Sequence, residues 1–192
     1  MSKKRILVCL TGASGAIYGV RTIDRLVHLG HEVQLIVSRW GAETLKHETG
    51  LTTSDLRQRV TRVYDEGDLS AGPASGSYQL DAMVIVPCTM KTLAGIAHGY
   101  ADNLISRAAD CSLKERRRLV VVPRETPLNL IHIRNMGILT EAGAIVIPAC
   151  PAFWHKPSTI EEVVDSVVER VLYHLAVLDD RKVEWTGNRP TA

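Results

Sequence analysis

The sequence predicts a single α/β domain, with a parallel sheet and helices on both faces. Short runs rich in Val, Ile and Leu recur along the chain, and segments with helical apolar spacing separate them. Continuous apolar runs are typical of strands buried on both faces. The regular alternation of strand and helix favours crossover connections and therefore a parallel sheet.

The amino-terminal half begins with two strand–helix pairs. An apolar run at 6–10 leads through a turn of small residues into helical spacing over 17–29, which Gly30 ends. The pattern repeats with a strand at 33–37 and a helix at 40–48. A short helix at 51–61 and a Gly- and Ser-rich loop at 67–77 follow.

The carboxy-terminal half continues the alternation. Each of its apolar β-branched runs ends at a proline, which marks the end of a strand. Ser158 and Glu161 have the spacing of a capping box at the start of the last helix. The expected strands are residues 82–86, 119–122 and 145–147, and the expected helices are residues 90–97, 104–116, 128–142 and 158–177.

Composition bounds the class of protein. A length of 192 residues, with 45% hydrophobic and 23% charged residues, suits one globular domain. Lys plus Arg number 23 and Asp plus Glu 21, so the net charge of +2 gives no strong field toward nucleic acid or an anionic membrane. No apolar stretch approaches the 18 residues of a membrane span. We therefore expect neither nucleic acid nor membrane as a partner.

The four cysteines, Cys9, Cys88, Cys111 and Cys150, are far apart and form no CxxC pair. This spacing disfavours a zinc site or a disulfide framework and indicates a reducing cytoplasm. The histidines show no metal-ligand spacing either, so we expect no metal. Cys88 could be a nucleophile, but without a neighbouring base a buried structural thiol is favoured.

Polar residues follow every expected strand, and ligands of open α/β sheets bind beyond these carboxyl ends. The turn Gly12–Gly15 offers backbone N–H groups, the Ser14 hydroxyl and a helix N-terminus, which suit a phosphate or another anion. A tight strand-to-helix turn explains the same residues equally well. Ser38 stands where a dinucleotide site needs an acidic residue, which argues against NAD and leaves mononucleotides open.

Two further strand ends carry candidate site residues. Thr89, Lys91 and Thr92 straddle a helix start and form a second anion-friendly cradle, although Thr89 could act simply as a helix cap. Arg124 and Glu125 follow the strand that ends at Pro123. Such a pair is either a surface salt bridge or, at a central strand end, an anion ligand beside a proton-transfer group.

Seven motifs in order resemble the UbiX-type flavin prenyltransferases over nearly the whole chain. The matching segments are Thr11–Ala16, Pro73–Ser77, Pro87–Ala94, Asn103–Asp110, Leu113–Arg117, Val122–Glu125 and Pro151–Pro157. The resemblance implies that reduced FMN reacts with dimethylallyl phosphate, which joins the prenyl unit to flavin N5 and C6 and closes a fourth ring. It also implies a flavodoxin-like or Rossmann-type fold, a homo-oligomer, typically a dodecamer, and a UbiD-type decarboxylase that receives the prenylated FMN.

The resemblance also assigns residues. It places FMN contacts at Gly12, Ala13, Ser14, Ser38, Thr89, Met90, Lys91, Thr92 and Arg124. It gives catalytic positions to Ser14, Glu48, Lys114 and Glu125. Substrate contacts, partly across subunit interfaces, fall on Ser75, Gly76, Arg107, Lys114, Trp154, Arg170 and Trp185. Residues 178–192 are expected to form a tail that packs on a neighbouring subunit, with Trp185 closing that subunit's site.

One position departs from the resemblance. The family usually has Tyr where this chain has Trp154, and the Tyr hydroxyl bonds the prenyl phosphate. An indole N–H donates from a different place and cannot accept. Two other activities stay open: an FMN-dependent decarboxylase of cysteine type, whose usual Pro-Ala-Ser-Ala-Asn-Thr differs from Pro73–Tyr78 here, and a non-catalytic FMN-binding or delivery protein.

Overall fold

The computed structural model describes residues 2–178 and contains one six-stranded sheet. All neighbouring strands are parallel, in the order β3-β2-β1-β4-β5-β6. The strands are β1 (Arg5–Leu10), β2 (Glu32–Val37), β3 (Arg62–Tyr64), β4 (Ala82–Cys88), β5 (Arg118–Pro123) and β6 (Ile145–Val146). The predicted α/β class with a parallel sheet is confirmed.

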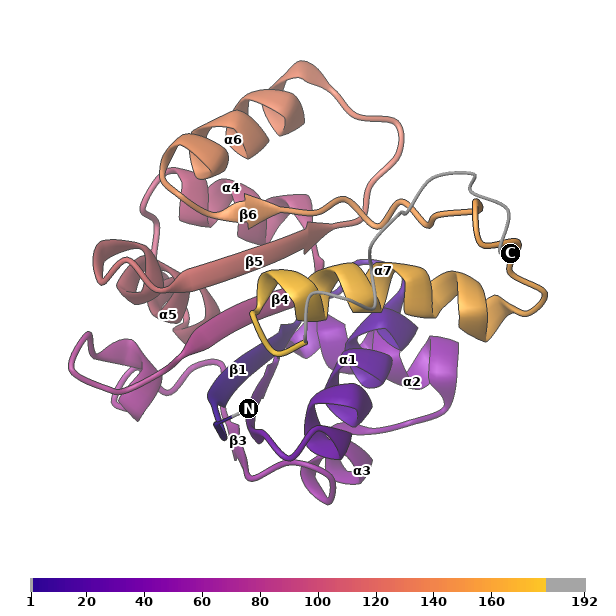
Figure 1. Cartoon of the computed structure of the whole chain (residues 1–192). Helices are drawn as coiled ribbons and strands as arrows, with labels where there is room; N and C mark the ends of the chain where they lie inside the picture. The colour runs from indigo at the N-terminus through magenta and orange to yellow at the C-terminus, as the bar shows by residue number, and fades with distance from the viewer. Residues whose placement is uncertain (1, 179–192) are drawn as a thin grey trace.

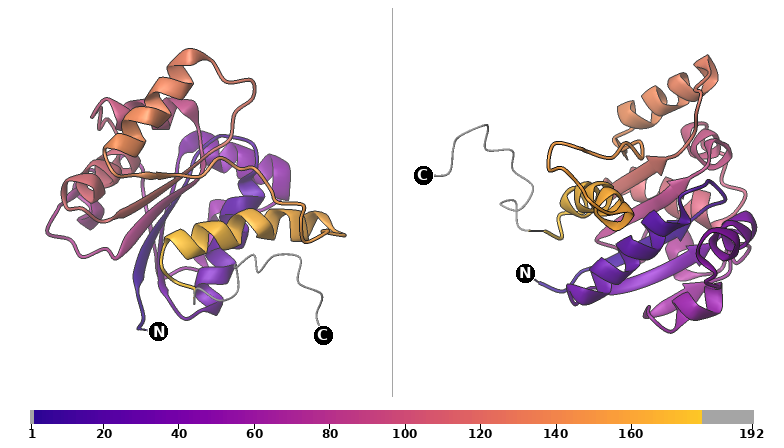
Figure 2. Two further views of the ribbon diagram at one scale, coloured as in Figure 1. Left: turned by 45° about the horizontal axis from the view of Figure 1, so that its top comes forward. Right: turned by 90° about the vertical axis from the view of Figure 1, so that its right-hand side faces the viewer.

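Helices cover both faces of this sheet (Figure 1). They are α1 (Ala16–His28), α2 (Arg39–Thr49), α3 (Thr53–Arg57), α4 (Met90–Ala97), α5 (Leu104–Lys114), α6 (Leu130–Glu141) and α7 (Ile160–His174), with a 3₁₀ turn at Gly72–Ala74. Figure 2 shows α1 and α7 packed together on one face, while α4, α5 and α6 lie on the other.

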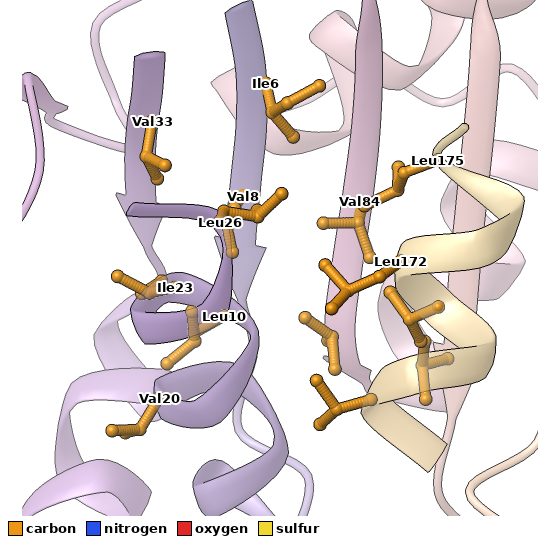
Figure 3. Packing of buried hydrophobic residues seen from close by; sticks show 14 of the residues in the cluster. Ile6, Val8, Leu10, Val20, Ile23, Leu26, Val33, Val84, Leu172 and Leu175 are labelled. Atoms are coloured by element: carbon orange, nitrogen blue, oxygen red, sulfur yellow. The ribbon is translucent and has the colours of Figure 1, made fainter. Parts of the chain in front are cut away.

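Alternate residues of the central strands build two separate cores. Val8 and Leu10 of β1 pack with Ile23 of α1 and Leu172 of α7 in the first core (Figure 3). Leu7 and Cys9, which point to the opposite face, pack with buried residues of α4, α5 and α6 in the second. Both faces are therefore apolar along the same strand, which explains the continuous runs that the sequence shows.

Side-chain caps place the helix starts at the carboxyl ends of strands. Ser38 Oγ accepts from the Gly41 N–H at 3.0 Å at the start of α2, and Thr89 Oγ1 accepts from the Thr92 N–H at 3.2 Å at the start of α4. Asn103 and Ser106 form a capping box on α5. Each cap satisfies an N–H group that has no partner inside its helix.

Three sequence-based element predictions need correction. Strand β3 was not expected, because three residues are too few to show a period. The segment 51–61 is helical only over Thr53–Arg57. The last helix is capped by Thr159, not Ser158, and Glu162 instead of Glu161 occupies the third helical position. Thr159 and Ser158 are both good caps, and sequence spacing alone does not separate them.

The strand order defines where a ligand should bind. Strand β1 lies between β2 and β4, so the connections leaving β1 and β4 go to opposite sides of the sheet. Open α/β sheets bind ligands in the crevice at such a switch point, beyond the carboxyl ends of the strands. The segments Thr11–Gly15 and Thr89–Thr92 border this crevice.

Candidate flavin site

A pocket of about 650 Å³ lies at this switch point. That volume is in the range of small-molecule and cofactor sites. The lining comes from the carboxyl ends of β1, β2 and β4 and from two further loops. It comprises Thr11, Gly12, Ser38, Arg39, Trp40, Glu66, Gly67, Thr89, Lys91, Thr92, Asp102, Asn103 and Ile105.

Three threonines tie two walls of this pocket together. The Thr89 N–H donates to Thr11 Oγ1 at 2.8 Å, and the Thr11 hydroxyl donates to the Pro87 carbonyl at 2.8 Å. Thr89 Oγ1 caps α4 and lies 3.1 Å from Thr92 Oγ1. Among the described residues, the N–H groups of Met90 and Lys91 in the first turn of α4 have no partner, so they can bind an anion such as a flavin phosphate.

The first turn of α1 is used differently from the phosphate hypothesis. Glu48 Oε2 of α2 accepts from the Gly15 N–H at 2.9 Å and from the Ala16 N–H at 2.8 Å. The anion at this helix N-terminus is thus the protein's own carboxylate, and the cradle for an external phosphate is the one at α4. A carboxylate satisfies amides that point at it as readily as a phosphate does.

Glu48 also links two other candidate residues, Ser14 and Arg124. Burial of this side chain opposes its ionisation, but hydrogen bonds from the Ser14 hydroxyl and from the amides of Ala16 and Gly15 outweigh that cost. The positive charge of Arg124 acts in the same direction, and the pKa of Glu48 lies below its ordinary value. Ser14, Glu48 and Arg124 therefore form one connected polar group beside the pocket.

Replacing Glu48 with Gln is expected to remove an acid-sensitive part of the folding free energy. Because the native pKa is depressed, the carboxylate stabilises the fold above its ordinary pKa of 4.5, and the effect is lost as the pH falls through the lower native value. A surface anion at a helix N-terminus contributes about 0.3–1 kcal/mol. Urea unfolding at pH 7 and pH 4 should show the difference from wild type shrinking at acid pH.

Glu43→Gln, on the same helix and exposed, is the matched control and should show no such change. A Glu48→Gln deficit that grows on acidification would contradict the depressed pKa.

One wall of the pocket was missed from the sequence. Trp40, in the first turn of α2, is 67% exposed and faces the pocket. A Cβ on Gly12 would lie 2.6 Å from Trp40 Cβ, so the lack of a side chain at Gly12 makes room for the indole. The Arg39 guanidinium lies 5.6 Å from the centre of the Trp40 ring, and Glu66 accepts from the Arg39 N–H at 2.9 Å.

The second missed group lies beside α5. Asp102 pairs with the Lys91 ammonium at 3.4 Å, and both side chains line the pocket with Asn103. The pair is exposed, so it adds little stability but fixes where the Lys91 charge sits. The signal that could have found these residues is the Asn103 helix cap, which places this segment at the carboxyl edge of the sheet.

Arg124 and Glu125 do not form the surface salt bridge considered above. Glu125 Oε1 instead accepts from the Thr126 N–H at 3.0 Å, and both side chains are exposed at the carboxyl end of β5. The Arg124 charge also acts on Tyr18, whose pKa is raised by burial and partly lowered again by this Arg. The two residues thus diverge, with Arg124 toward α1 and Glu125 free to face a ligand.

The two predicted substrate residues of α5 lie at different heights: Arg107 is about one turn from the helix start, and Lys114 is at the opposite edge of the sheet. Helix α5 begins at the flavin pocket and ends at Lys114, just before β5 starts. Six residues of β5, at roughly 3.3 Å each, separate Lys114 from Arg124 by about 20 Å. Lys114 lies beside Gly76 and pairs with Glu115, while Arg107 binds the Ala74 carbonyl and Asp110. A single chain therefore does not bring Lys114 to its own flavin pocket.

The remaining substrate candidates are also separate. Arg170 lies in the last turns of α7, on the other face of the sheet from α5, and its guanidinium lies 5.1 Å from the centre of the Tyr173 ring. Trp154 is 57% exposed in the loop before α7, with its ring edge-on to His155. Trp185 and the tail from residue 179 lie outside the described residues.

Other chemistries find little support in the described part of the chain. Burial raises the pKa of the Cys88 thiol, which fits a structural thiol and not a nucleophile. No group of three or more His, Cys, Asp or Glu side chains within residues 2–178 could hold a metal ion. No helix in the same range is long and apolar enough to cross a membrane.

Comparison with known proteins identifies the family. The Flavoprotein family model matches residues 1–172, so the chain belongs to the Flavoprotein family. Within it, the chain is a member of the UbiX-type flavin prenyltransferases. It is 46% identical over 185 residues to a probable UbiX-like flavin prenyltransferase of Bacillus subtilis, covering 96% of this chain and 91% of the relative. It is 44% identical to the flavin prenyltransferase UbiX of Thauera aromatica, covering 96% and 95%.

Solved structures agree on the fold. AnUbiX, crystallised with FMN and dimethylallyl pyrophosphate, superposes with a TM-score of 0.93 at 45% identity, covering 98% of this chain and all of that one. A dodecameric FMN-dependent UbiX-like decarboxylase from Escherichia coli O157:H7 superposes with a TM-score of 0.90 at 41% identity, covering 95% and 99%. The FMN-dependent cysteine decarboxylase TvaF, at 18% identity and a TM-score of 0.64, shares the fold alone.

Proposed function

We propose that this protein is a flavin prenyltransferase that joins the dimethylallyl group of dimethylallyl phosphate to N5 and C6 of reduced FMN. The observation that carries the proposal is the switch-point pocket with an open helix N-terminus at α4, next to Ser14, Glu48 and Arg124. The relatives to which this chain is 46% and 44% identical have names that state the activity, which supports the proposal.

The pocket fits a flavin mononucleotide. Its volume of about 650 Å³ is large enough for the cofactor. The phosphate can be bound by the two unpaired amides of α4 and by the hydroxyls of Thr89 and Ser38. Trp40 and Ile105 provide apolar surface for the ring system. Bound reduced FMN would supply the two nucleophilic atoms to which the prenyl carbons become joined. Gly12, Ala13, Met90, Lys91 and Thr92 would hold it from the two strand ends.

The reaction needs a cationic site and a base. Breaking the allylic C–O bond releases phosphate and leaves positive charge on the prenyl carbons. Lys114, Arg107 and Arg170 would bind the departing phosphate, and preorganised cations of this kind stabilise the charge that develops. The indole face of Trp154 would stabilise the allylic cation. Glu125 would accept the proton that leaves C6 of the flavin when the new ring closes.

This chemistry requires more than one subunit. Lys114 lies beside Gly76 at the end of α5, about 20 Å from Arg124 along β5. We therefore propose that one subunit contributes the flavin pocket and another contributes Lys114, in a homo-oligomer like the dodecameric relative. The tail 178–192, with Trp185, would complete the site from a neighbour, and residues 1–192 would form one flavoprotein domain.

Anaerobic incubation with reduced FMN and dimethylallyl phosphate tests the function directly. Release of a flavin heavier than FMN by one five-carbon isoprene unit is the expected result. Unchanged FMN would favour a delivery protein, and decarboxylation of a cysteine-ended peptide would favour the cysteine decarboxylases. Dimethylallyl diphosphate should be tested in parallel, because Trp154 changes the donor near the phosphate.

FMN should bind in clear preference to NAD. Ser38, at the end of β2, lines the pocket and cannot bind a ribose diol as an acidic residue would. The single cradle at α4 suits one terminal phosphate. Titration with FMN, FAD and NAD, followed by flavin fluorescence or calorimetry, measures the preference, and NAD binding as tight as FMN would contradict it.

The product suggests the partner and the compartment. We propose that a UbiD-type decarboxylase receives the prenylated FMN. The described cysteines are free, with Cys9, Cys88 and Cys111 buried, which is consistent with a cytoplasmic location.

A further inference from the structure

A loop without regular structure lies against α5. After the 3₁₀ turn Gly72–Ala74, the chain runs through Ser75–Gln79 before β4 begins at Ala82. Its side chains alternate: Ser75, Ser77 and Gln79 are exposed, while Ala74, Gly76 and Tyr78 are half-buried. One edge of the segment therefore faces the protein and the other faces outward.

Arginine side chains hold the inward edge by its carbonyl groups. Arg117 donates to the Gly76 carbonyl at 2.5 Å and to the Tyr78 carbonyl at 2.8 Å. Arg107 Nε donates to the Ala74 carbonyl at 3.0 Å, and Arg5 donates to the Gln79 carbonyl at 3.1 Å. Charged donors make the stronger hydrogen bonds, and the planar guanidinium fork of Arg117 fixes two carbonyls at once.

Tyr78 anchors the same segment to the sheet. The buried Gln34 amide of β2 donates to the Tyr78 hydroxyl oxygen at 2.8 Å, and the hydroxyls of Tyr64 and Tyr78 lie 3.0 Å apart. Burial, together with the hydrogen bond to Tyr78, raises the pKa of Tyr64 to about 12, so the Tyr64 hydroxyl stays neutral at physiological pH. The guanidinium of Arg5 also lies 5.4 Å from the centre of the Tyr78 ring.

The outward edge is left for a ligand. The hydroxyls of Ser75 and Ser77 lie 2.9 Å apart on the exposed side. Lys114 and Glu115, which pair with each other, both abut Gly76 so closely that a Cβ there would overlap the ammonium and the carboxylate. The two serines and the Lys114 cation therefore share one surface, and their relative placement depends on the arginines behind the loop.

We propose that Arg117 is a positioning residue for the prenyl substrate: it holds the Ser75–Tyr78 segment against Lys114 in the geometry that binds dimethylallyl phosphate. This inference rests on the proposed function. Arg117 is half-buried, and both of its donors point at the loop, so it does not touch the substrate. Misplacement of a binding surface by about 1 Å can reduce catalysis about a hundredfold, which makes such a clamp consequential.

Arg117→Gln tests the inference, with Arg116→Gln as its control. The control removes the same charge from an exposed neighbour in the same Arg triplet. Arg117→Gln should raise the KM for dimethylallyl phosphate about tenfold or more, as loss of charged hydrogen bonds predicts. Its kcat should stay within about threefold, and its Kd for FMN should be unchanged because the segment that Arg117 holds contains none of the residues assigned to FMN binding. Arg117→Lys should recover part of the loss, since one ammonium can still reach one carbonyl.

Amide hydrogen exchange supplies a readout that does not depend on turnover. Residues 74–78 should exchange faster in Arg117→Gln than in Arg116→Gln, with exchange in β1 and β4 unchanged. A KM equal to that of the control, or an increase in KM accompanied by an equal loss of FMN affinity, would overturn the positioning role. If Arg117→Gln does not fold, Arg117→Lys takes its place in the test. An Arg117→Lys variant with the wild-type KM and wild-type amide exchange would also overturn the positioning role. If the wild-type protein makes no prenylated flavin, the proposed function and this inference are both wrong. If the wild type is active but Arg117→Gln has the same KM and the same amide exchange as Arg116→Gln, only the inference is wrong.

Discussion

Mixed oligomers of Lys114→Ala and Arg124→Ala subunits are expected to regain flavin prenylation that each variant has largely lost. Each substitution removes a cation that the proposed site requires. A lost charged hydrogen bond costs roughly 1.5–3 kcal/mol, so each pure variant should fall about ten- to a hundredfold under limiting substrate. The two residues lie at opposite ends of β5, and one chain cannot supply both to the same substrate.

The recovery follows from the assembly. If every site takes Arg124 from one subunit and Lys114 from another, about a quarter of the sites in an equal mixture contain both native residues, as for random pairing across a repeated interface. Co-expression with two different affinity tags and sequential purification would isolate mixed oligomers. Each variant mixed with itself, tagged both ways, gives the baseline. A mixture no more active than this baseline would show that each subunit builds its site alone.

The order of strands and helices could be predicted from the sequence because apolar residues recur at the positions that the fold buries. Every strand except β3 was predicted to within two residues, and β1, β2, β4 and β5 are buried along most of their length. The edge strand β3 was missed since only its Tyr64 is fully buried, and three residues carry no period. Local composition likewise does not show that β3 pairs with β2 across a long connection.

The site was less accessible to sequence reasoning because its parts depend on long-range packing. The Glu48 carboxylate binds the N-terminus of α1, although Glu48 lies 32 residues downstream of Ala16. No local sequence motif predicts this contact. Trp40 and Glu66 line the pocket only because α2 and the β3 loop converge on β1. The motifs that did locate the pocket, at Gly12 and Thr89, stand directly at strand ends, where position along the chain fixes position in space.

The two-part arrangement of the predicted residues has a physical origin as well. Helix α5 runs antiparallel to the strands, so its first turn borders the flavin pocket while its last turn reaches the opposite edge (Figure 1). A cation at Lys114 stabilises the helix C-terminus. The same residue can serve a neighbour's pocket only if the oligomer brings that pocket to this edge. One sequence motif thus supplies a helix end in its own chain and a proposed substrate contact in another.

Glu125→Gln is expected to lower the rate of ring closure by about 10²- to 10⁴-fold, the usual contribution of a positioned general base. The new bond at flavin C6 forms as the prenyl double bond takes up a proton, which alkylation of N5–H has released, and as C6 loses its own proton. The free carboxylate oxygen of Glu125 is the group that we propose receives the C6 proton. A Gln amide keeps the shape and can still accept from the Thr126 N–H, but it cannot take up the proton. Binding of FMN should therefore change little.

Single-turnover measurements separate the two bond-forming steps. Phosphate release reports cleavage of the allylic C–O bond and should proceed in Glu125→Gln, while the absorbance of the four-ring product should appear slowly. Glu125→Asp keeps a carboxylate on a shorter side chain and should recover part of the rate. Glu141→Gln, at an exposed position at the end of α6, controls for the loss of one charge. If phosphate release and ring closure slowed equally, Glu125 would act in binding or C–O cleavage. If neither slowed, another group would have to accept the C6 proton, and the position of Glu125 after β5 would be incidental to the chemistry.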